Sequence, residues 1–291
     1  MNIYDEMVEI LNSKKSKRAK DQMLLKLGIR KCELHRIWDS YKHFNMYRPS
    51  FDIDGLTFGV EMECVNAPVS RVTTQMQANG IDCRFLGYTH ETTPSFKLVS
   101  DSSLQGSNTI ECVSPILKGE SGENLLKNAC KALSEAGAGV NRSCGLHIHF
   151  GAENMTDKHY INIFKNYQKI ENAIDEVMPE SRKANNSRWC NSLVRFNFEF
   201  CQTKSDVAGV ICSRYTKVNS QSYNRHKTIE FRQHSGTINY TKIMGWVKFL
   251  KDLIKFSEKN VLTENINHIE DLSFVSDETM AYLKARKEAL A

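Results

Sequence analysis

Two glutamates alternate with apolar residues in the segment FGVEMEC, residues 58–64. Successive side chains of a β-strand point to opposite faces of the sheet, so Glu61 and Glu63 would project from one face. Gly59 precedes them on that face and leaves room for a bulky group. Neighbouring carboxylates repel each other unless cations neutralise them, and Mg²⁺ prefers oxygen ligands. The segment therefore predicts a strand that presents a cation site.

The same alternation predicts strands that carry imidazoles and an acid–base pair later in the chain. In GLHIHFG, residues 145–151, His147 and His149 share one face between flanking glycines. In TIEFRQHS, Glu230 and Arg232 share a face. Histidine can complete a metal site, and the planar fork of arginine matches the oxygens of a phosphate. These strands therefore supply groups that could act together with the two glutamates.

Two further acids fit the same pattern. Glu111 lies opposite apolar neighbours in TIECVSP, and Asp101 lies beside a serine-rich turn in SDSSL. A half-exposed antiparallel sheet also alternates polar and apolar residues without any function, and each strand taken alone allows that explanation. However, Glu-x-Glu, His-x-His and Glu-x-Arg are unusual for a solvent-facing surface, which favours Lys, Thr and Ser. If the polar faces converge, they form a single binding hollow.

A zinc-dependent hydrolase is an alternative interpretation of the His-x-His strand. His147 and His149, with Cys144 nearby, could bind Zn²⁺ through nitrogen and sulfur. A third ligand would have to come from His226, His234 or a glutamate, and the sequence leaves that choice open. A phosphotransferase that releases ADP without forming an amide is a further alternative on the same set of residues.

The strands alternate irregularly with amphipathic helices. Helices are predicted at ENLLKNACKALSEAGAG, at TDKHYINIFKNYQKIENAIDEVM with Thr156 or Asp157 as its N-cap, at TKIMGWVKFLKDLIKFSEK, and over residues 276–290. Further strands are predicted at NSLVRFNFEFCQT and YTKVNS. Because the order lacks a regular β-α alternation, the pattern favours an α+β fold with a largely antiparallel sheet and flanking helices.

The N-terminal segment differs from the rest in charge. Residues 1–50 hold 11 Lys and Arg against 6 Asp and Glu, which accounts for the whole net charge of +5. Two helical stretches break at Leu27-Gly28-Ile29, and an apolar seam is predicted at Leu24, Leu25, Leu34, Ile37, Trp38 and Tyr41. A packed helical pair is favoured, and a nucleic-acid-binding or partner-binding segment is the alternative.

Composition narrows the class of protein. Hydrophobic residues make up 41% of the chain and charged residues 25%, which is typical of a soluble globular protein. The sequence has no apolar run of about 20 residues and no signal-peptide pattern, so no membrane contact is expected. The nine cysteines are scattered singly, which indicates reduced thiols and a cytoplasmic location.

Five motifs, in order, resemble the amidoligase family of carboxylate–amine ligases, which are related to glutamine synthetase and glutamate–cysteine ligase. They are FGVEMEC, the pair SDSSL…IECVSP, CGLHIHFG, SRYTKVN and TIEFRQHSGTIN, spread over residues 55–245. Each motif alone is weak, whereas all of them in this order are fairly specific. Residues 1–50, the basic helical segment, and about 255–291 fall outside these motifs. We expect a catalytic domain at residues 51–291, with its motifs at 55–245 and C-terminal helices over residues 241–291.

The resemblance implies a curved sheet, as in the glutamine synthetase catalytic domain, whose concave face holds ATP, Mg²⁺ (or Mn²⁺) and the acid. The implied metal ligands are Glu61, Glu63, Glu111, His147 and Glu230. The implied nucleotide contacts are Arg232, Arg214, Arg188 and Asn219, with Arg232 and Arg214 also catalytic and Arg182 an alternative to Arg188. His149 and Asp101 are implied on the substrate side.

The resemblance also implies a two-step reaction. A carboxylate attacks the γ-phosphate of ATP to give an acyl phosphate, and an amine then displaces phosphate to give an amide or isopeptide bond. The partners would be a small-molecule or peptide carboxylate and an amine. The sequence leaves the identity of both substrates and the oligomeric state open.

Overall fold

The computed structural model describes residues 10–11, 13, 15–34, 37–38 and 55–290 of the chain. The chain divides into two units, residues 1–50 and residues 51–291, and each has a hydrophobic core of its own. Among the described residues, no helix combines the length and the apolar character that crossing a bilayer requires.

The first unit contains helix α2, Lys17–Lys26, and the 3-10 helix η1, Lys31–Glu33. The hydroxyl of Ser16 caps α2 by accepting a hydrogen bond from the backbone of Ala19. The helix ends before Gly28, whose φ of +90° suits a glycine, so the predicted break is confirmed. Of the predicted seam, Leu24 is buried, Leu34, Ile37 and Trp38 pack against it, Leu25 is exposed, and Tyr41 lies outside the described residues. A nucleic-acid contact by this unit stays a prediction.

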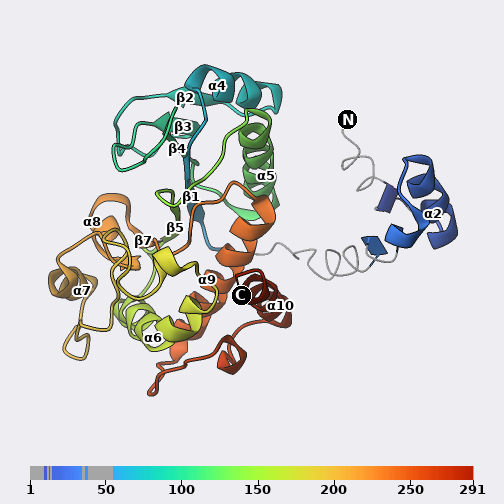
Figure 1. Cartoon of the computed structure of the whole chain (residues 1–291). Coiled ribbons are helices and arrows are strands. Elements are labelled where there is room, and N and C mark those ends of the chain that lie inside the picture. Colours follow the sequence, from blue (N-terminus) through green and yellow to red (C-terminus); the bar gives the residue numbers. More distant parts are fainter. Residues whose placement is uncertain (1–9, 12, 14, 35–36, 39–54, 291) are drawn as a thin grey trace. The chain divides into compact units, whose positions relative to one another are not determined.

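A seven-stranded sheet organises the second unit (Figure 1). Its strands are β1 (Phe58–Cys64), β2 (Cys83–Phe85), β3 (Phe96–Val99), β4 (Ile110–Val113), β5 (Leu146–Gly151), β6 (Val218–Asn219) and β7 (Thr228–Phe231). They run in the order β2-β3-β4-β1-β5-β7-β6, and every neighbouring pair is antiparallel except β2 and β3. The predicted α+β class with a largely antiparallel sheet is confirmed.

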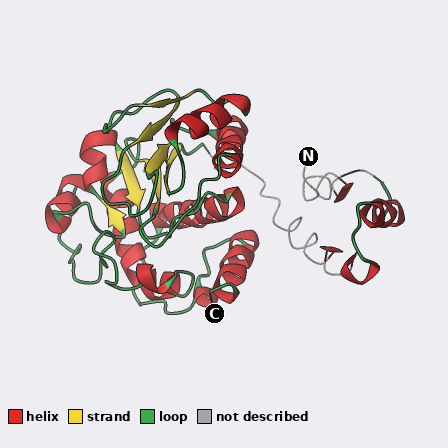
Figure 2. Cartoon of the chain, turned by 45° about the horizontal axis from the view of Figure 1, so that its top comes forward, coloured by secondary structure: helices red, strands yellow, loops and turns green. Residues whose placement is uncertain are grey.

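Helices surround the sheet (Figure 2). They are α4 (Val69–Ala78), α5 (Gly119–Glu135), α6 (Asp157–Asp175), α7 (Lys204–Ile211), α8 (Gln221–His226), α9 (Tyr240–Lys259) and α10 (Asp277–Glu288), with 3-10 turns η2 (Glu180–Arg182) and η3 (Ile269–Asp271). The apolar faces of β1, β4, β5 and β7 share one core with the buried sides of α5, α6 and α9. Thr156 caps α6 through its hydroxyl, as predicted. The core therefore takes one face of the sheet and leaves the polar face for the site.

The strand predicted at residues 191–203 is wrong, because this segment forms turns that lie against α6. The side chains of α6 satisfy the backbone groups that a strand partner would otherwise bind. The Glu171 carboxylate accepts a hydrogen bond from the Leu193 N–H, and the Gln168 amide donates to the carbonyls of Leu193 and Phe196. Phe200 is 88% exposed, so the apolar residues of this segment do not form a strand face.

Glu123 of α5 is expected to make the free energy of unfolding depend on pH. Its side chain is buried, and neither carboxylate oxygen has a hydrogen-bond partner in the described part of the chain. Burial raises the pKa of Glu123 from 4.5 to about 8. The folded protein therefore keeps a proton that the unfolded chain loses, so we expect the free energy of unfolding to fall as the pH rises from 4.5 to 8.

Replacing Glu123 with Gln should remove this loss, which we expect to be about 1–3 kcal/mol. Urea unfolding at pH 5 and pH 9 would measure it, with the exposed Glu120→Gln on the same helix as the control. Equal pH dependence in the wild type and in Glu123→Gln would contradict the assignment.

Candidate functional site

Strand register brings the predicted polar residues side by side on one face of the sheet. Glu63 of β1 lies opposite Glu111 of β4, and Glu61 lies opposite His147 of β5. Further along β5, His149 lies opposite Glu230 of β7, which in turn lies opposite Asn219 of β6. Directly opposed residues of antiparallel strands point to the same face. Five neighbouring strands therefore contribute to a single cluster.

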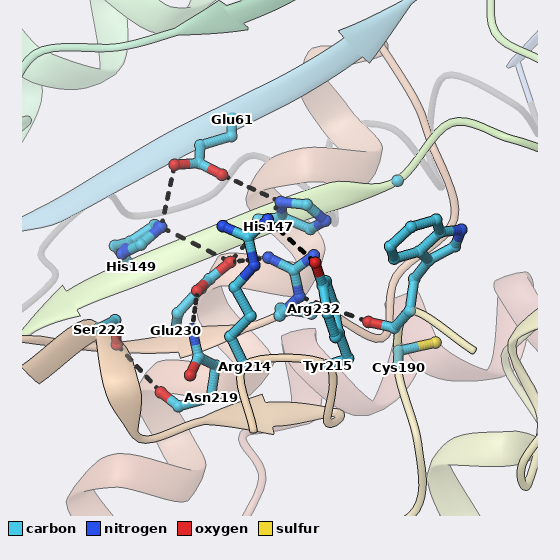
Figure 3. Close-up of polar contacts among 12 residues, drawn as sticks. Glu61, His147, His149, Cys190, Arg214, Tyr215, Asn219, Ser222, Glu230 and Arg232 are labelled. Carbon is cyan, nitrogen blue, oxygen red and sulfur yellow. Dashed lines mark hydrogen bonds and ion pairs between the residues drawn. The ribbon is translucent and has the colours of Figure 1, made fainter. Parts of the chain in front are cut away.

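The two histidines connect the carboxylates (Figure 3). Nδ1 of His147 lies 3.0 Å from Oε2 of Glu61 and 3.6 Å from Oε1 of Glu230, and its Nε2 lies 3.6 Å from Oε1 of Glu63. Nε2 of His149 lies 3.2 Å from Oε1 of Glu61 and 3.9 Å from Oε1 of Glu230. Glu63, His147 and Glu230 are buried. The cluster is thus compact and largely shielded from water.

The cluster forms part of the wall of a cavity of about 670 Å³. Ten of the eleven residues predicted for the site line this cavity; the exception is Arg188. Arg188 is exposed, and its guanidinium lies 4.6 Å from the centre of the Trp189 ring. Arg182, the alternative to Arg188, does line the cavity and is buried. The roles assigned to these residues stay predictions.

Three overlapping groups of side chains could each hold a divalent cation. The ligand atoms within each group lie within 4.8 Å of one another. The groups are Glu61, Glu111 and His147; Glu61, His149 and Glu230; and Glu63, Asp101 and Glu111. Carboxylate oxygens dominate all three, which suits Mg²⁺ or Mn²⁺. The arrangement could hold more than one cation at once.

His149 has the hydrogen bonding expected of a metal ligand, although the sequence placed it on the substrate side. Its Nδ1 is 2.9 Å from the hydroxyl of Thr228, whereas its buried Nε2 faces the carboxylates of Glu61 and Glu230 at 3.2 Å and 3.9 Å. A metal-binding imidazole characteristically uses one nitrogen for the ion and fixes the other with a hydrogen bond. The Nε2 that points at Glu61 and Glu230 therefore supports the fit of a cation among these three side chains.

The pKa values of the acids show how the crowded charges affect one another. Burial and the charges of Glu61 and Glu63 raise the pKa of Glu111 well above its ordinary value. Burial alone would also raise the pKa of Glu61. The charge of His149 and the hydrogen bond with His147 outweigh burial and hold this pKa well below its ordinary value. A bound cation would favour the ionised form of Glu111, as opposite charge does for any carboxylate.

Arg232 is held against the acid cluster. One guanidinium nitrogen donates to Oε1 of Glu230, and Nε lies 3.5 Å from the carbonyl of Trp189. Burial opposes ionisation of Glu230, but the charges of Arg232 and His149 lower its pKa. Asn219 donates to the other oxygen of Glu230. Glu230 is therefore an ionised carboxylate fixed from both sides.

The rim of the cavity includes residues that the sequence did not single out. Arg214, which was predicted, lies over Tyr215, and the Tyr215 ring meets the Trp189 ring edge-on at 5.0 Å. Tyr88 and His90 also line the cavity, and the Tyr88 hydroxyl is 2.8 Å from Nε2 of His90. Four further lining residues gave no signal in the sequence, because helix α8 was not predicted: Gln221, Ser222, Asn224 and Arg225. His226 also lines the cavity, and the sequence offered it only as a possible zinc ligand.

Lys97 is a further residue that sequence reasoning missed. It is buried on the polar face of β3, in register with Val113, and its ammonium donates to the Glu91 carbonyl. Burial lowers the pKa of Lys97. The alternation in FKLV could have predicted this placement. Lys97 lies two residues before Val99 and so shares its face, and Val99 lies opposite Glu111.

The geometry gives little support to a zinc site that uses Cys144. Among the described residues, none of the three candidate cation groups contains a cysteine. His234, one of the possible third ligands, is buried beside Trp246, and its Nδ1 lies 2.7 Å from the carbonyl of Ser235. His226 does line the cavity, with its ring centre 6.2 Å from that of His149. The metal-binding atoms that lie close together in the cavity are therefore mostly carboxylate oxygens.

A comparison with protein families agrees with the resemblance that the motifs indicate. A family model described as "putative amidoligase enzyme" matches residues 54–254, a range that contains all the predicted site residues. No curated protein matches the sequence. Among solved structures, the crystal structure of a "novel glutamine synthase homolog" is similar to this chain with a TM-score of 0.45 and 9% identity, over 86% of this chain and 69% of that chain.

Proposed function

This chain belongs to the amidoligase family, and we propose that it joins a carboxylate to an amine in a reaction that consumes ATP and requires Mg²⁺ (or Mn²⁺). The observation that carries the proposal is the convergence of Glu61, Glu111, His147, His149 and Glu230 in one cavity. An oxygen-rich set of this kind is suited to cations that carry nucleotide phosphates. The arginines of the same cavity would bind the phosphate oxygens.

In the first step, an oxygen of the substrate carboxylate attacks the γ-phosphorus of ATP, the bond to the β-phosphate oxygen breaks, and ADP leaves. Bound Mg²⁺ supplies charge neutralisation on the phosphate oxygens during this transfer. Arg232 would place its guanidinium on the transferring group, since Glu230 fixes that side chain on the wall of the cavity. The contribution of the protein is positioning and electrostatic stabilisation.

In the second step, the amine nitrogen attacks the acyl carbon, the carbon–oxygen bond to phosphate breaks, and the released phosphate takes up the proton that the nitrogen loses. Phosphate is the leaving group, so the reaction needs no protein nucleophile. Burial raises the pKa of the Cys144 thiol, two residues before β5, which disfavours the reactive thiolate. This supports direct transfer between the substrates over a thioester route.

Incubation of the protein with ATP, Mg²⁺ and pooled acids and amines tests the proposal. We expect ADP to form only when both an acid and an amine are present, with a product lighter than the summed reactants by one water in the mass spectrum. ADP release without an amide would favour the phosphotransferase alternative. One tightly held zinc by elemental analysis, with hydrolysis in place of ADP formation, would contradict the ligase.

A further inference from the structure

The first unit of the chain carries a dense positive charge on a folded scaffold. Residues 15–34 hold seven Lys and Arg against two acids. The unit lies outside residues 54–254, which the family model matches, and its charge has no part in the proposed ligase reaction. A folded unit with this excess of positive charge is suited to a polyanionic partner.

The scaffold of this unit is helix α2 followed by a tight turn. The helix ends in a Schellman motif, in which Gly28 has a φ of +90° and the Ile29 N–H donates to the Leu24 carbonyl at 3.2 Å. Leu24 is fully buried, and Ile29 and Trp38 pack against it. The indole N–H of Trp38 donates to Asp21, the only acid of α2, at 2.5 Å. The inner face of α2, with its acid, is therefore occupied by the core of the unit.

The outer face of α2 is basic. Arg18, Gln22 and Lys26 follow one another at intervals of four residues, so their side chains form a row along one side of the helix. All three are exposed. Lys15 before the helix and Lys31 in η1 after the turn are exposed as well. These five residues, four cations and one amide, are the basic face of the unit.

An anionic membrane surface fits the basic face poorly. A helix that lies in a membrane interface buries a continuous apolar face among the lipids. The apolar side of α2 is already taken by Leu24 and its neighbours in the core of the unit. On the rest of the helix, Leu25 is the one large apolar residue that is exposed, at 40%. The charge of this face is therefore better matched by a polyanion that needs no apolar contact.

The dimensions of the helix suit duplex DNA. The ten residues of α2 extend about 15 Å, and the major groove of B-form DNA is about 12 Å wide and admits an α-helix. Arg18 and Lys26 lie about 12 Å apart along the helix axis, so they can contact phosphates on the two sides of the groove. Gln22 lies between them with a donor and an acceptor for base edges. The deep and narrow major groove of A-form RNA excludes such a helix.

We propose that the basic face binds duplex DNA, with its four cations on phosphates and Gln22 in the major groove. This binding activity goes beyond the ligase function and does not depend on it, because none of the five residues lines the cavity. Contacts to phosphates are independent of base sequence, so the face binds any DNA duplex at low salt concentration.

Fluorescence anisotropy of a labelled DNA duplex, titrated with the full chain, tests the proposal. Four phosphate contacts predict an affinity that falls about 100-fold between about 50 mM and about 200 mM KCl, because each contact releases condensed counterions. A quadruple variant that combines Lys15→Gln, Arg18→Gln, Lys26→Gln and Lys31→Gln should bind at least about 10-fold more weakly at the lower salt concentration. It should also lose most of the salt dependence.

A matched control replaces four exposed lysines of the second unit with Gln and changes the net charge by the same amount. These lysines are Lys118, Lys127, Lys259 and Lys284. We expect the control to bind DNA as the wild type does. If circular dichroism shows that the quadruple variant does not fold, the double variant of Arg18→Gln and Lys26→Gln tests the same face. It should remove about half of the salt dependence.

Absence of DNA binding at about 50 mM KCl, or wild-type binding by a folded quadruple or double variant, would overturn the proposal. An affinity for duplex RNA equal to that for duplex DNA would overturn the placement of α2 in the major groove. Equally tight binding to vesicles of phosphatidylcholine and phosphatidylserine would overturn the choice of DNA over a membrane surface.

The two proposals can fail separately. The quadruple variant should form amide at the wild-type rate, since its four positions lie outside the cavity. DNA binding that depends on the basic face, together with no amide product from any acid and amine, would support this proposal and refute the ligase. Amide formation by a chain that does not bind DNA would do the opposite.

Discussion

Glu61→Gln and Glu230→Gln are expected to lower ADP formation that depends on acid and amine by about 10²–10³-fold or more, with the fold intact. Glu61 belongs to two of the three candidate cation groups, and Glu230 belongs to the group that contains His149. An amide of the same shape keeps the packing but loses the negative charge and one acceptor oxygen. The cations that neutralise the phosphates would then be held too weakly or in the wrong place.

The exposed Glu264→Gln, in the loop after α9, is a matched control that should keep wild-type turnover. Circular dichroism and thermal unfolding would show whether the site variants remain folded. Turnover at the wild-type rate in a folded Glu61→Gln or Glu230→Gln protein would contradict the assignment of these carboxylates to the cations.

Arg232→Lys is expected to be nearly as severe, with a loss of about 10²-fold in kcat. The guanidinium can contact Glu230 and the Trp189 carbonyl while presenting further N–H groups to the cavity. A lysine ammonium is a point charge on a flexible stem and cannot hold two fixed contacts and a phosphate at once. Steady-state ADP release at saturating ATP would measure the effect.

Arg195→Lys is the control for this substitution, since Arg195 is exposed, lies over the Phe196 ring and does not line the cavity. A kcat for Arg232→Lys within a few-fold of the wild type would show that charge alone is sufficient. In that case the proposal that Arg232 needs its planar guanidinium to hold its protein contacts and a phosphate at once would be wrong.

The sequence predicted the acidic face of the sheet because strand alternation is a local property. Glu61, Glu63, His147, His149 and Glu230 each alternate with apolar neighbours, and those neighbours now form the core. The long helices α6 and α9 were predicted for the same reason, since each carries its own periodic apolar stripe. Strand pairing was not readable, but a shared residue chemistry on several strands was enough to predict convergence.

Other features depended on contacts that no local pattern reveals. The segment 191–203 looked like a strand, but its backbone bonds are made by Glu171 and Gln168 of α6. The six-residue helix α8 was too short to give a periodic signal. Arg182 and Arg188 are six residues apart in one loop, and only the fold shows that Arg182 enters the cavity.

Anomalous diffraction from crystals grown with Mn²⁺ and a non-hydrolysable ATP analogue tests the central claim most directly. The account predicts Mn²⁺ peaks at about 2.0–2.6 Å from the oxygens of Glu61 and Glu230 and close to Nε2 of His149, with the nucleotide phosphates on the same ions. Nucleotide and Mn²⁺ bound elsewhere on the protein, or no Mn²⁺ among these three side chains at saturating concentration, would contradict it.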